Sequence, residues 1–437
     1  MARSSSSSSG GISTGGSRDL SRRGFLGSTA ALGAAAALPA ATSGRSGPRL
    51  DELRIGLVGC GGRGTGAAYQ ALSTKGPIRL VAMADMFEDR LNGSLNSISN
   101  EDRLKERVDV PVERRYVGAN AYLELIEKAD VDVVLLATPP HFRPAHFEAA
   151  VKAGKHVFME KPVAVDGFGI RQVLKAAGEA KAKSLKVGVG LQRHHQKSYR
   201  ACMEQIAAGG IGRIVAMHVY WNMGALWSVA RKPEHTDIEW QLRNWLYFAW
   251  LSGDHIVEQH IHNLDVANWA KGEMPVECFG AGGRQVRTDP VFGHIFDHHS
   301  VHYRYADGTT LFSMCRQQAG CPSKVSEHLI GSEGRADLGG PFRFERYDGW
   351  NWSFNEGDNN PYQVEHDDLF AAIRNGTEYN EAEYGAESTL TAIMGRMATY
   401  SGKVISRDQA LQSARLGPET YEFDQALPVD PIPMPGL

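Results

Sequence analysis

The sequence predicts an α/β protein of two domains: a doubly wound parallel sheet, followed by an α+β domain built on an open, mostly antiparallel sheet. Short apolar runs alternate with helical stretches over residues 52–190, and a glycine-rich turn follows the first of these runs. After residue 191 the strand-like segments come in pairs joined by tight turns. Alternating strands and helices are typical of parallel sheets, and successive hairpins are typical of antiparallel ones.

The first 41 residues differ in composition and are left out of the predicted fold. A serine run at residues 4–9 precedes residues 21–26 (SRRGFL), and an uncharged, alanine-rich stretch continues to Ala41. Paired arginines before a weakly apolar stretch are typical of a twin-arginine export signal, which predicts a periplasmic or otherwise extracytoplasmic protein. The alternative is a disordered low-complexity tail.

Composition and charge exclude several classes of partner. Of the 437 residues, 42% are hydrophobic and 22% are charged. This hydrophobic fraction is enough for a large core. The total charge is −3, and residues 1–41 contribute +3 through four arginines and one aspartate, so residues 42–437 carry −6. A mildly acidic chain has no electrostatic basis for nucleic-acid binding, and no membrane span is expected in the mature protein. The five cysteines show no C-x-x-C spacing, which argues against a disulfide framework or a zinc cage.

The first predicted strand and helix enclose a glycine turn that suits a dinucleotide. Residues 53–58 (LRIGLV) form an apolar run, and a helical stretch ends at Gly76. The first glycine between them permits a tight turn, the second lets backbone approach a pyrophosphate, and the third allows close packing of helix on strand. The residues expected to contact the phosphates are Gly59, Gly61, Gly62, Arg63 and Gly64.

The second predicted strand, residues 78–85 (IRLVAMAD), ends in Asp85, 26 residues after Gly59. A carboxylate at this position can accept hydrogen bonds from the ribose diol of adenosine and would repel a 2′-phosphate. The nearest arginine is Arg90, so NAD is expected rather than NADP. The alternative is that Asp85 is a solvated residue at a strand end.

Three later strands bring further polar residues to the same edge of the sheet. Residues 131–137 (VDVVLLA) form a nearly continuous apolar run, as in a central parallel strand that is covered on both faces. Residues 155–162 (KHVFMEKP) and 184–193 (SLKVGVGLQR) add two more strands. Cofactors bind at the carboxyl ends of such strands, where the expected contacts are Thr138, Pro139, Pro140, His141, Glu160 and Lys161.

With these features the chain resembles the Gfo/Idh/MocA oxidoreductases, the superfamily of glucose–fructose oxidoreductase and inositol dehydrogenase. The resemblance spans about residues 52–405 and includes the glycine turn, Asp85, the block AGKHVFMEKP (residues 153–162) and His262-x-x-Asp265. It implies an NAD-binding Rossmann domain at residues 52–190, a substrate-binding and oligomerisation domain at 191–405, and a C-terminal tail at 406–437. It also implies a homo-oligomer formed through the open sheet of the second domain.

Residues 253–269 (GDHIVEQHIHNLDVANW) concentrate polar side chains in an apolar segment that we expect to form one helix. Glu258 and His262 are four residues apart and so lie on one face, and Asp265 is three residues further on. Metal binding is disfavoured and no metal is expected, because His260 and His262 are two apart and would point in different directions, and no H-E-x-x-H spacing occurs. A buried polar network is a second interpretation.

The third interpretation is acid–base chemistry for hydride transfer. His262 is the expected base for a substrate hydroxyl, Glu258 the carboxylate that orients its ring, and Lys161 the cation that stabilises a developing alkoxide. The resemblance agrees on Lys161 and His262. The family's dehydrogenases commonly carry Asp where this chain has Glu258, so the substrate preferences of inositol dehydrogenases do not transfer directly.

Aromatic and polar residues near this segment indicate the kind of substrate. Aromatic side chains crowd residues 221–250, and aromatic faces stack on sugar rings, although most such residues belong to ordinary cores. Polar residues follow the last strand of the first domain and could equally lie at the surface. A polyol or carbohydrate is expected, with contacts from Gln192, Arg193, His194, Trp245 and Asp265.

The sequence therefore predicts an NAD-dependent oxidoreductase that transfers hydride between nicotinamide and a secondary hydroxyl or ketone of a sugar, cyclitol or sugar derivative. Tight binding of NAD is expected, because free cofactor is scarce outside the cytoplasm. Two alternatives stay open. One is a redox-elimination glycosidase or lyase that oxidises the sugar transiently, and the other is a non-catalytic dinucleotide-binding sensor, which Lys161 and His262 disfavour.

Overall fold

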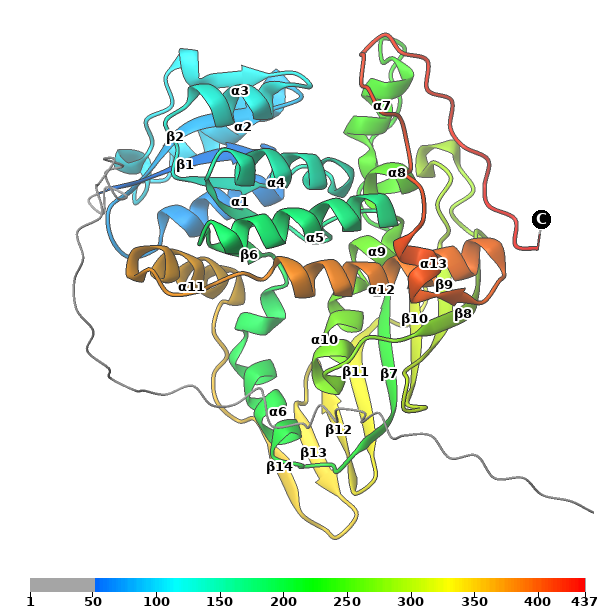
Figure 1. The fold of residues 1–437 in the computed structure, drawn as a ribbon. Helices are drawn as coiled ribbons and strands as arrows, with labels where there is room; N and C mark the ends of the chain where they lie inside the picture. Colours follow the sequence, from blue (N-terminus) through cyan, green and yellow to red (C-terminus); the bar gives the residue numbers. More distant parts are fainter. Residues whose placement is uncertain (1–51, 437) are drawn as a thin grey trace, which may run out of the picture. The chain divides into compact units, whose positions relative to one another are not determined.

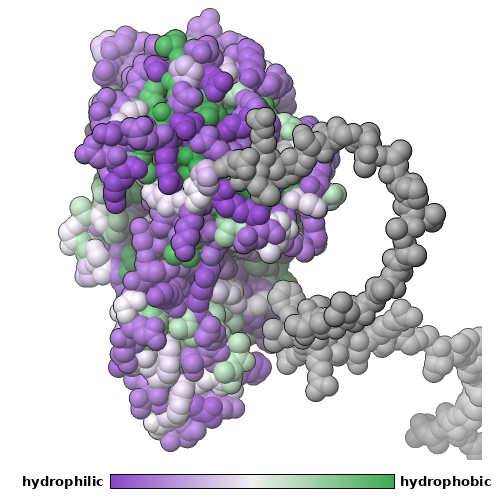
Figure 2. Space-filling model, turned by 90° about the vertical axis from the view of Figure 1, so that its left-hand side faces the viewer, coloured by the Kyte–Doolittle hydropathy of each residue, from purple (hydrophilic) through white to green (hydrophobic). Residues whose placement is uncertain are grey.

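The computed structural model describes residues 52–436, whose elements Figure 1 colours along the sequence. The candidate export signal at residues 1–41 lies outside these described residues. No helix within residues 52–436 is long and apolar enough to cross a membrane. On the face seen in Figure 2, hydrophilic residues predominate and hydrophobic ones gather in small groups between them, as is ordinary for a protein surface.

Six parallel strands form the first sheet, in the order β3-β2-β1-β4-β5-β6, which confirms the predicted doubly wound domain. They are β1 (Leu53–Val58), β2 (Ile78–Asp85), β3 (Arg115–Val117), β4 (Val133–Leu136), β5 (His156–Met159) and β6 (Val187–Val189). Strand β4 is buried over its whole length, which is why it contains no polar residue. Strand β3 was not predicted, because three partly exposed residues form too short a pattern.

Helices cover both faces of this sheet. Val133 and Leu135 of β4 pack with α1, α2 and α11, and Val134 and Leu136 pack with α3, α4 and α5. These helices are α1 (Gly62–Leu72), α2 (Glu88–Ser99), α3 (Ala121–Lys128), α4 (Arg143–Lys152), α5 (Gly167–Ala182) and α11 (Pro361–Asn375). Helix α11 lies far along the sequence yet supplies core residues such as Leu369 to the first sheet, so one face of this sheet is completed by a late segment.

Nine strands form the second sheet, in the order β14-β13-β12-β11-β7-β10-β9-β8-β15. The β7–β10 pair is parallel and the others are antiparallel, which confirms the predicted mostly antiparallel sheet. The predicted hairpins are β9–β10, which turns at Asp307-Gly308, and β11–β12. The strands are β7 (Ile214–Met223), β8 (Glu277–Gly283), β9 (His298–Arg304), β10 (Thr310–Gln317), β11 (Lys324–Gly331), β12 (Gly334–Leu338), β13 (Arg343–Arg346), β14 (Asn351–Ser353) and β15 (Ile405–Ser406).

One face of the second sheet packs against helices. Helix α10 (Ile261–Lys271) contacts β7 and β11, and α12 (Ala382–Ser401) contacts β8 and β9, as Figure 1 shows. The remaining helices connect the sheets or flank them: α6 (Lys197–Ala207), α7 (Asp237–Arg243), α8 (Ala249–Ser252), α9 (His255–Glu258) and α13 (Arg407–Leu411).

The polar stretch at residues 253–269 is two helices, so the prediction of one continuous helix is wrong. Helix α9 ends at Glu258 and α10 begins at Ile261. At the break, the His260 amide donates to the His255 carbonyl (3.1 Å), five residues back, instead of four. Side-chain bonds from Gln259 to Glu258 and from His260 to Ser313 hold the break, and periodicity alone carries no sign of them.

The C-terminal segment (residues 412–436) has no helix or strand but is attached to the body of the protein. The Leu416 amide donates to Asp166 Oδ2 (2.8 Å), and Gln241 Nε2 donates to the Leu427 carbonyl (2.6 Å). Tyr421 packs in a cluster of aromatic residues from α7 and α8. The segment therefore joins the end of the chain to both the first sheet's helices and the α7–α8 region.

Candidate active site

A cavity of about 460 Å³ opens at the carboxyl ends of β1, β2 and β4. This is the edge at which doubly wound sheets bind dinucleotides. Most of the residues expected to contact the cofactor line this cavity: Gly59, Gly61, Gly62, Arg63, Asp85, Thr138 and Pro139.

The glycine turn has the shape that a pyrophosphate requires. Gly59 has a φ of +94°, and a Cβ there would lie 2.5 Å from the Thr138 amide nitrogen. A Cβ on Gly64 would lie 1.8 Å from the Gly59 carbonyl oxygen, so both positions exclude side chains. A Cβ on Gly61 would meet no atom within 4 Å. The open space beside Gly61 and the free N–H groups at the start of α1 fit a dinucleotide phosphate.

Asp85 ties the glycine turn to β2. Its Oδ2 accepts a hydrogen bond from the Cys60 amide (2.6 Å), and its Oδ1 accepts one from the Phe87 amide (2.9 Å). Burial raises the pKa of this carboxyl, against the lowering effect of those two amides and of the Arg90 charge. Asp85 is half-buried at the cavity wall, so it is not a freely solvated strand end.

Residues in and next to α7 also line this cavity: Trp227, Leu242, Arg243 and Trp245. The Arg243 guanidinium lies 3.9 Å from the centroid of the Phe87 ring, and its Nη1 donates to Asp89 (3.1 Å). Trp245, expected to contact substrate, lies in the wall of the cavity that Asp85 lines. Arg243 was not predicted, because its partner Asp89 is 154 residues away and no local pattern carries such a pair.

Pro140 and His141 do not line this cavity, although they were expected to contact the cofactor. His141 is oriented toward the C-terminal segment, where its Nε2 pairs with the Tyr421 hydroxyl and its ring lies 5.0 Å from that of Trp250. Burial lowers the pKa of His141 to about 3, and the Arg415 charge adds to this effect. The neutral ring is part of the packing that holds the C-terminal segment.

Lys161 and Glu258 form an ion pair beyond the end of β5. Lys161 Nζ donates to Glu258 Oε1 (2.8 Å) and to the Glu258 carbonyl oxygen (2.5 Å). Glu258 Oε2 accepts a hydrogen bond from Gln259 Nε2. The Glu258 carboxylate therefore pairs with Lys161, and the prediction that Glu258 orients the His262 ring is wrong. The break between α9 and α10 removes the shared helix face on which that prediction rested.

His262 is a buried, neutral imidazole close to the lysine. Burial lowers its pKa well below the usual value, and the charges of Lys161 and Arg193 lower it further. Its Nδ1 has no hydrogen-bond partner among the described residues. Its ring stacks on Trp221, with centroids 5.8 Å apart and planes 25° apart. The ring is therefore neutral and carries a lone pair, and the nearby Lys161 and Arg193 charges oppose its protonation.

Arg193 belongs to a buried network, so its expected role as a substrate contact is not what the structure shows. Its Nη1 donates to Glu327 Oε1 and to the His262 carbonyl oxygen (3.2 Å). Glu327 is fully buried and also accepts hydrogen bonds from Tyr199 and Asn263. The network joins β11 and α10 and fixes the backbone that carries His262.

His194 and Asp265 pair with each other instead of facing an open site. His194 Nε2 lies 2.9 Å from Asp265 Oδ2, and its ring is stacked between Trp269 and Tyr384. Ser388 donates to the other oxygen of Asp265 (2.7 Å). Asp265 therefore follows the interpretation of this segment as a buried polar network, and His194, expected to be either a substrate contact or a surface residue, is its partner. Gln192 is not part of this pair: its Nε2 donates a hydrogen bond to the Tyr362 hydroxyl (3.3 Å).

Arg63 connects the cavity to the lysine. Its Nε donates to Glu160 Oε1, and its Nη2 donates to Glu365 Oε1 (3.1 Å). Glu160 immediately precedes Lys161, so one guanidinium links the glycine turn, the end of β5 and α11. Burial and the Glu160 charge raise the pKa of Glu365 well above its usual value. Glu365 was not predicted, because its link to the site is the hydrogen bond from Arg63, 302 residues earlier in the sequence.

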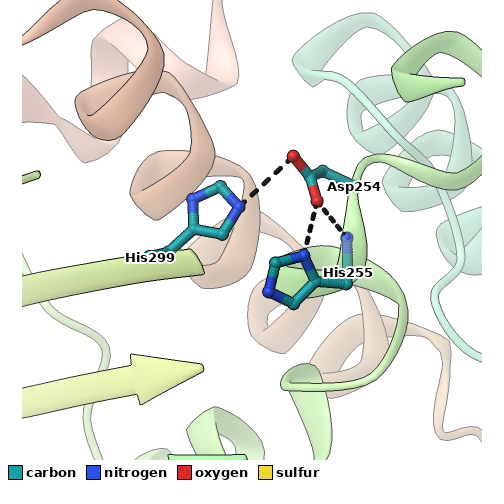
Figure 3. Close-up of side chains that lie close together, drawn as sticks. All are labelled: Asp254, His255 and His299. Carbon is teal, nitrogen blue, oxygen red and sulfur yellow. Dashed lines mark hydrogen bonds and ion pairs between the residues drawn. The ribbon is translucent and has the colours of Figure 1, made fainter. Parts of the chain in front are cut away.

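Asp254, the N-cap of α9, lies close to His255 of α9 and His299 of β9 (Figure 3), with one ligand atom of each within 4.8 Å of the others. Asp254 accepts hydrogen bonds from His255 Nδ1 (2.8 Å), the Phe296 amide (3.0 Å) and the Tyr400 hydroxyl (2.6 Å), and His299 Nε2 lies 3.2 Å away. The carboxylate oxygens are occupied by these donors, so the group holds α9 by hydrogen bonds and is not available as a metal site. It anchors Asp254 itself at a φ of +72°, where a non-glycine residue is strained.

Buried histidines predict loss of stability in acid. Burial is the largest cause that lowers the pKa values of five of them, to about 3 or 4: His141, His146, His255, His260 and His366. Each folded pKa lies below the unfolded value of 6.5, so the unfolded chain binds protons that the folded chain does not. Stability is therefore full above pH 6.5 and falls as the pH drops toward these values, by up to about 2 kcal/mol per histidine at pH 5.

The melting temperature measured from pH 7.5 to pH 5 checks this expectation. It should decline steeply below pH 6.5. His195 opposes the trend, because Asp368 and Glu381 outweigh burial and raise its pKa. A melting temperature that stays level down to pH 5 would show that burial does not lower the pKa values of these rings.

Two family descriptions match the chain. Residues 53–190 match "Oxidoreductase family, NAD-binding Rossmann fold", and residues 199–337 match "GFO/IDH/MocA C-terminal domain". The second match begins nine residues after the first one ends, between β6 of the parallel sheet and β7 of the antiparallel sheet.

Individual proteins are similar over parts of the chain. An inositol 2-dehydrogenase of Rhizobium meliloti (strain 1021) is 26% identical over 249 residues, and the chain spans 63% of that relative's length. These residues are 57% of this chain. A glycosyl hydrolase family 109 protein of Shewanella amazonensis (strain ATCC BAA-1098 / SB2B) is 31% identical over 160 residues, 33% of this chain and 34% of that protein.

The fold has solved counterparts. The crystal structure of scyllo-inositol dehydrogenase from Lactobacillus casei, with bound cofactor NAD(H) and scyllo-inositol, gives a TM-score of 0.61. The superposition covers 82% of this chain and 99% of that chain, at 20% sequence identity. At this identity the likeness concerns the arrangement of the sheets and helices.

Proposed function

We propose, since the chain belongs to the Gfo/Idh/MocA oxidoreductase family, that it is an NAD-dependent oxidoreductase acting on a secondary hydroxyl of a sugar or cyclitol. The observation that supports this most strongly is the Lys161–Glu258 ion pair beside neutral His262, linked through Glu160 and Arg63 to a glycine-lined cavity. The inositol dehydrogenase relative supports the choice of substrate class.

The site residues have distinct roles in the proposed reaction. When bound, NAD supplies the hydride acceptor. His262 takes the hydroxyl proton, since its ring is neutral and carries an unpartnered ring nitrogen. Lys161 directs an ammonium toward the substrate oxygen and stabilises the negative charge that develops there. Glu258 balances the lysine charge and sets the direction of its side chain.

A substrate panel tests the proposal. Purified protein with NAD is incubated with inositol isomers and aldoses, and reduced nicotinamide is followed by absorbance and fluorescence. Formation of NADH with one class of polyol supports the proposal and identifies the class. Absence of reduction and of product across the panel, in protein that binds NAD, would count against it.

A redox-neutral reaction is the second candidate, and the match to a glycosyl hydrolase family 109 protein favours it. The same proton and charge groups would serve a transient oxidation at a sugar hydroxyl, followed by elimination of a glycosidic bond and return of the hydride. Release of an aglycone from a nitrophenyl glycoside without net NADH distinguishes this reaction from a simple dehydrogenase.

Tight binding of NAD is part of the proposal, and the packing over the cavity supports it. Arg243 lies on one side of Phe87, and Phe423 of the C-terminal segment lies 5.9 Å from the same ring. Leaving the site past Phe87 would therefore disturb both α7 and the C-terminal segment. Wild-type protein is expected to keep its nicotinamide through rapid gel filtration, and protein that elutes without it would contradict tight binding.

Phe423→Ala is expected to speed NAD dissociation by up to about tenfold, because an aromatic pair contributes about 0.5–1.5 kcal/mol beyond its buried area. The dissociation rate is measured by displacement with a fluorescent nicotinamide analogue. Val429→Ala, at an exposed position of the same segment, is the matched control and should leave the rate unchanged. Equal NAD dissociation rates for Phe423→Ala and wild type would show that Phe423 of the C-terminal segment does not help to retain NAD.

Export by the twin-arginine route is also proposed, from the motif SRRGFL and the uncharged stretch that follows it. Fusing residues 1–41 to a reporter tests this in cells with and without a functional twin-arginine translocase. Replacing Arg22 and Arg23 by lysines should abolish export, and export that persists in the translocase mutant would contradict the proposal.

We also propose that two copies of the chain associate through the second sheet. The face of this sheet turned away from α10 and α12 exposes Phe279 and Phe312, and Phe312 stacks on His302 at 4.4 Å. Met314 and Ile330 extend this exposed apolar area. Sedimentation velocity should show an oligomer that Phe312→Asp dissociates, and a monomer in the wild type would contradict it.

A further inference from the structure

A line of buried side chains continues from the active-site ion pair into the second sheet. Gln259 Nε2 donates to Glu258 Oε2, and Gln317 Nε2 donates to Gln259 Oε1 (3.0 Å). Arg287 Nη1 donates to Gln317 Oε1. All three added residues are buried: Gln317 is 0% exposed, Arg287 3% and Gln259 7%. The line thus runs from the partly buried Lys161–Glu258 pair to the buried Arg287.

Along this line, which group donates each hydrogen bond and which accepts it follows from the chemistry of the side chains. A guanidinium only donates hydrogen bonds, so the Gln317 oxygen must face Arg287 and its amide hydrogens must face Gln259. The Gln259 oxygen is then fixed toward Gln317, and its amide hydrogens are directed at Glu258. The next side chain must accept a hydrogen bond from the Gln259 amide. An ionised Glu258 carboxylate is such an acceptor. Lys161 meets that carboxylate from the other side as a donor.

Arg287 is itself fixed at the far end. Its Nη2 donates to the Phe296 carbonyl oxygen (2.5 Å), and its backbone amide donates to Asp297 Oδ2 (3.0 Å). The charged or titratable groups that interact with it include Asp254, Asp297, Tyr247, Tyr400, Arg284, His255 and Cys315. The guanidinium therefore cannot turn away, and Gln317 has no alternative partner that would let its amide reverse.

We propose that Gln259, Gln317 and Arg287 are positioning residues that hold Glu258 as a carboxylate against Lys161, so that the lysine faces the substrate oxygen as an ammonium. This rests on the proposed oxidoreductase function. The other groups around Glu258 are the buried Arg143 of α4, whose charge interacts with it, and Glu160 and His262, which flank Lys161. Gln259 sits at the break between α9 and α10, so the break itself is what directs its amide to the carboxylate.

Reversing the line tests the proposal. In Gln317→Glu, the new carboxylate pairs with Arg287 and presents oxygen, instead of N–H, to Gln259. Gln259 then turns its own oxygen toward Glu258, which favours a protonated Glu258. The acid limb of the kcat pH profile should move upward by about one pH unit, the worth of one hydrogen bond to a charged group. At any fixed pH on that acid limb, kcat should therefore fall about tenfold, with an unchanged KM and NAD content.

Three further variants make the result specific. Gln412→Glu is the charge control: it adds the same charge at an exposed position after α13, and should keep the wild-type profile. Gln317→Leu removes the donor without adding charge and should shift the profile in the same direction. Gln259→Leu removes the donor to Glu258 directly, at a position that is 7% exposed, and serves if the Gln317 variants do not fold.

A measurement without substrate separates this inference from the proposed function. Infrared spectra of the NAD-loaded protein are recorded against pH, and the band of protonated Glu258 is identified by its loss in Glu258→Gln and in Glu258→Gln/Gln317→Glu. The band should appear at a higher pH in Gln317→Glu than in wild type, whatever the enzyme's substrate. Identical band positions on the pH scale, or an unmoved acid limb in an active enzyme, would overturn the inference.

Discussion

Lys161→Ala is expected to lower kcat on the polyol substrate by about 10³-fold while NAD remains bound. In the proposed reaction the ammonium stabilises the developing alkoxide, and loss of such a group typically removes several kcal/mol of transition-state stabilisation. Its removal also leaves the Glu258 carboxylate unpaired near the substrate oxygen, which adds an unfavourable charge. Steady-state kinetics and the nicotinamide content of the purified variant measure the two parts of this prediction.

Lys152→Ala provides the control for that change. Lys152 lies at the exposed end of α4, where it pairs with Glu148, and should keep wild-type kinetics. His262→Ala should behave like Lys161→Ala, since the base and the cation act on the same oxygen. Full activity in His262→Ala would show that another group takes the proton.

Glu327→Ala is expected to lower the free energy of unfolding by about 3–5 kcal/mol. The carboxylate is fully buried and accepts hydrogen bonds from Arg193, Tyr199 and Asn263. Its removal leaves the buried Arg193 charge without a partner, which is more damaging than the loss of the ion pair itself. Urea unfolding followed by tryptophan fluorescence measures the change.

Glu333→Ala, at the exposed turn of the β11–β12 hairpin, is the matched control and should change stability by less than about 1 kcal/mol. Glu327→Gln keeps an acceptor oxygen and should lose less than Glu327→Ala. A Glu327→Ala protein as stable as wild type would mean that the network around Arg193 contributes nothing to holding His262.

The parallel sheet could be predicted from sequence because its strands are buried on both faces and therefore contain unbroken apolar runs. Strands β1, β2, β4 and β5 show this pattern, and β3 does not, since it is three residues long and partly exposed. The hairpins of the second sheet were predictable from their turns, of which Asp307-Gly308 is one. The contribution of α11 to the first sheet was not, because it depends on packing between residues far apart in sequence.

The site was predictable where its residues lie in local motifs and unpredictable where they act across long separations. The glycine turn, Asp85, Lys161 and His262 all came from short patterns. The partner of Glu258 was assigned wrongly, because helical periodicity placed it on one face with His262 and contained no sign of the break at Gln259. The role of Arg193 depends on Glu327, 134 residues later, and that of Arg243 on Asp89, 154 residues earlier.

Transfer of a labelled hydride tests the central claim most directly. NAD-loaded protein is mixed with the active polyol deuterated at the carbinol carbon, quenched within one turnover, and the nicotinamide is analysed by mass spectrometry and NMR. Deuterium at C4 of the nicotinamide ring, on one face only and lost in Lys161→Ala, is the predicted result. Product that forms while the nicotinamide carries no deuterium would contradict the account.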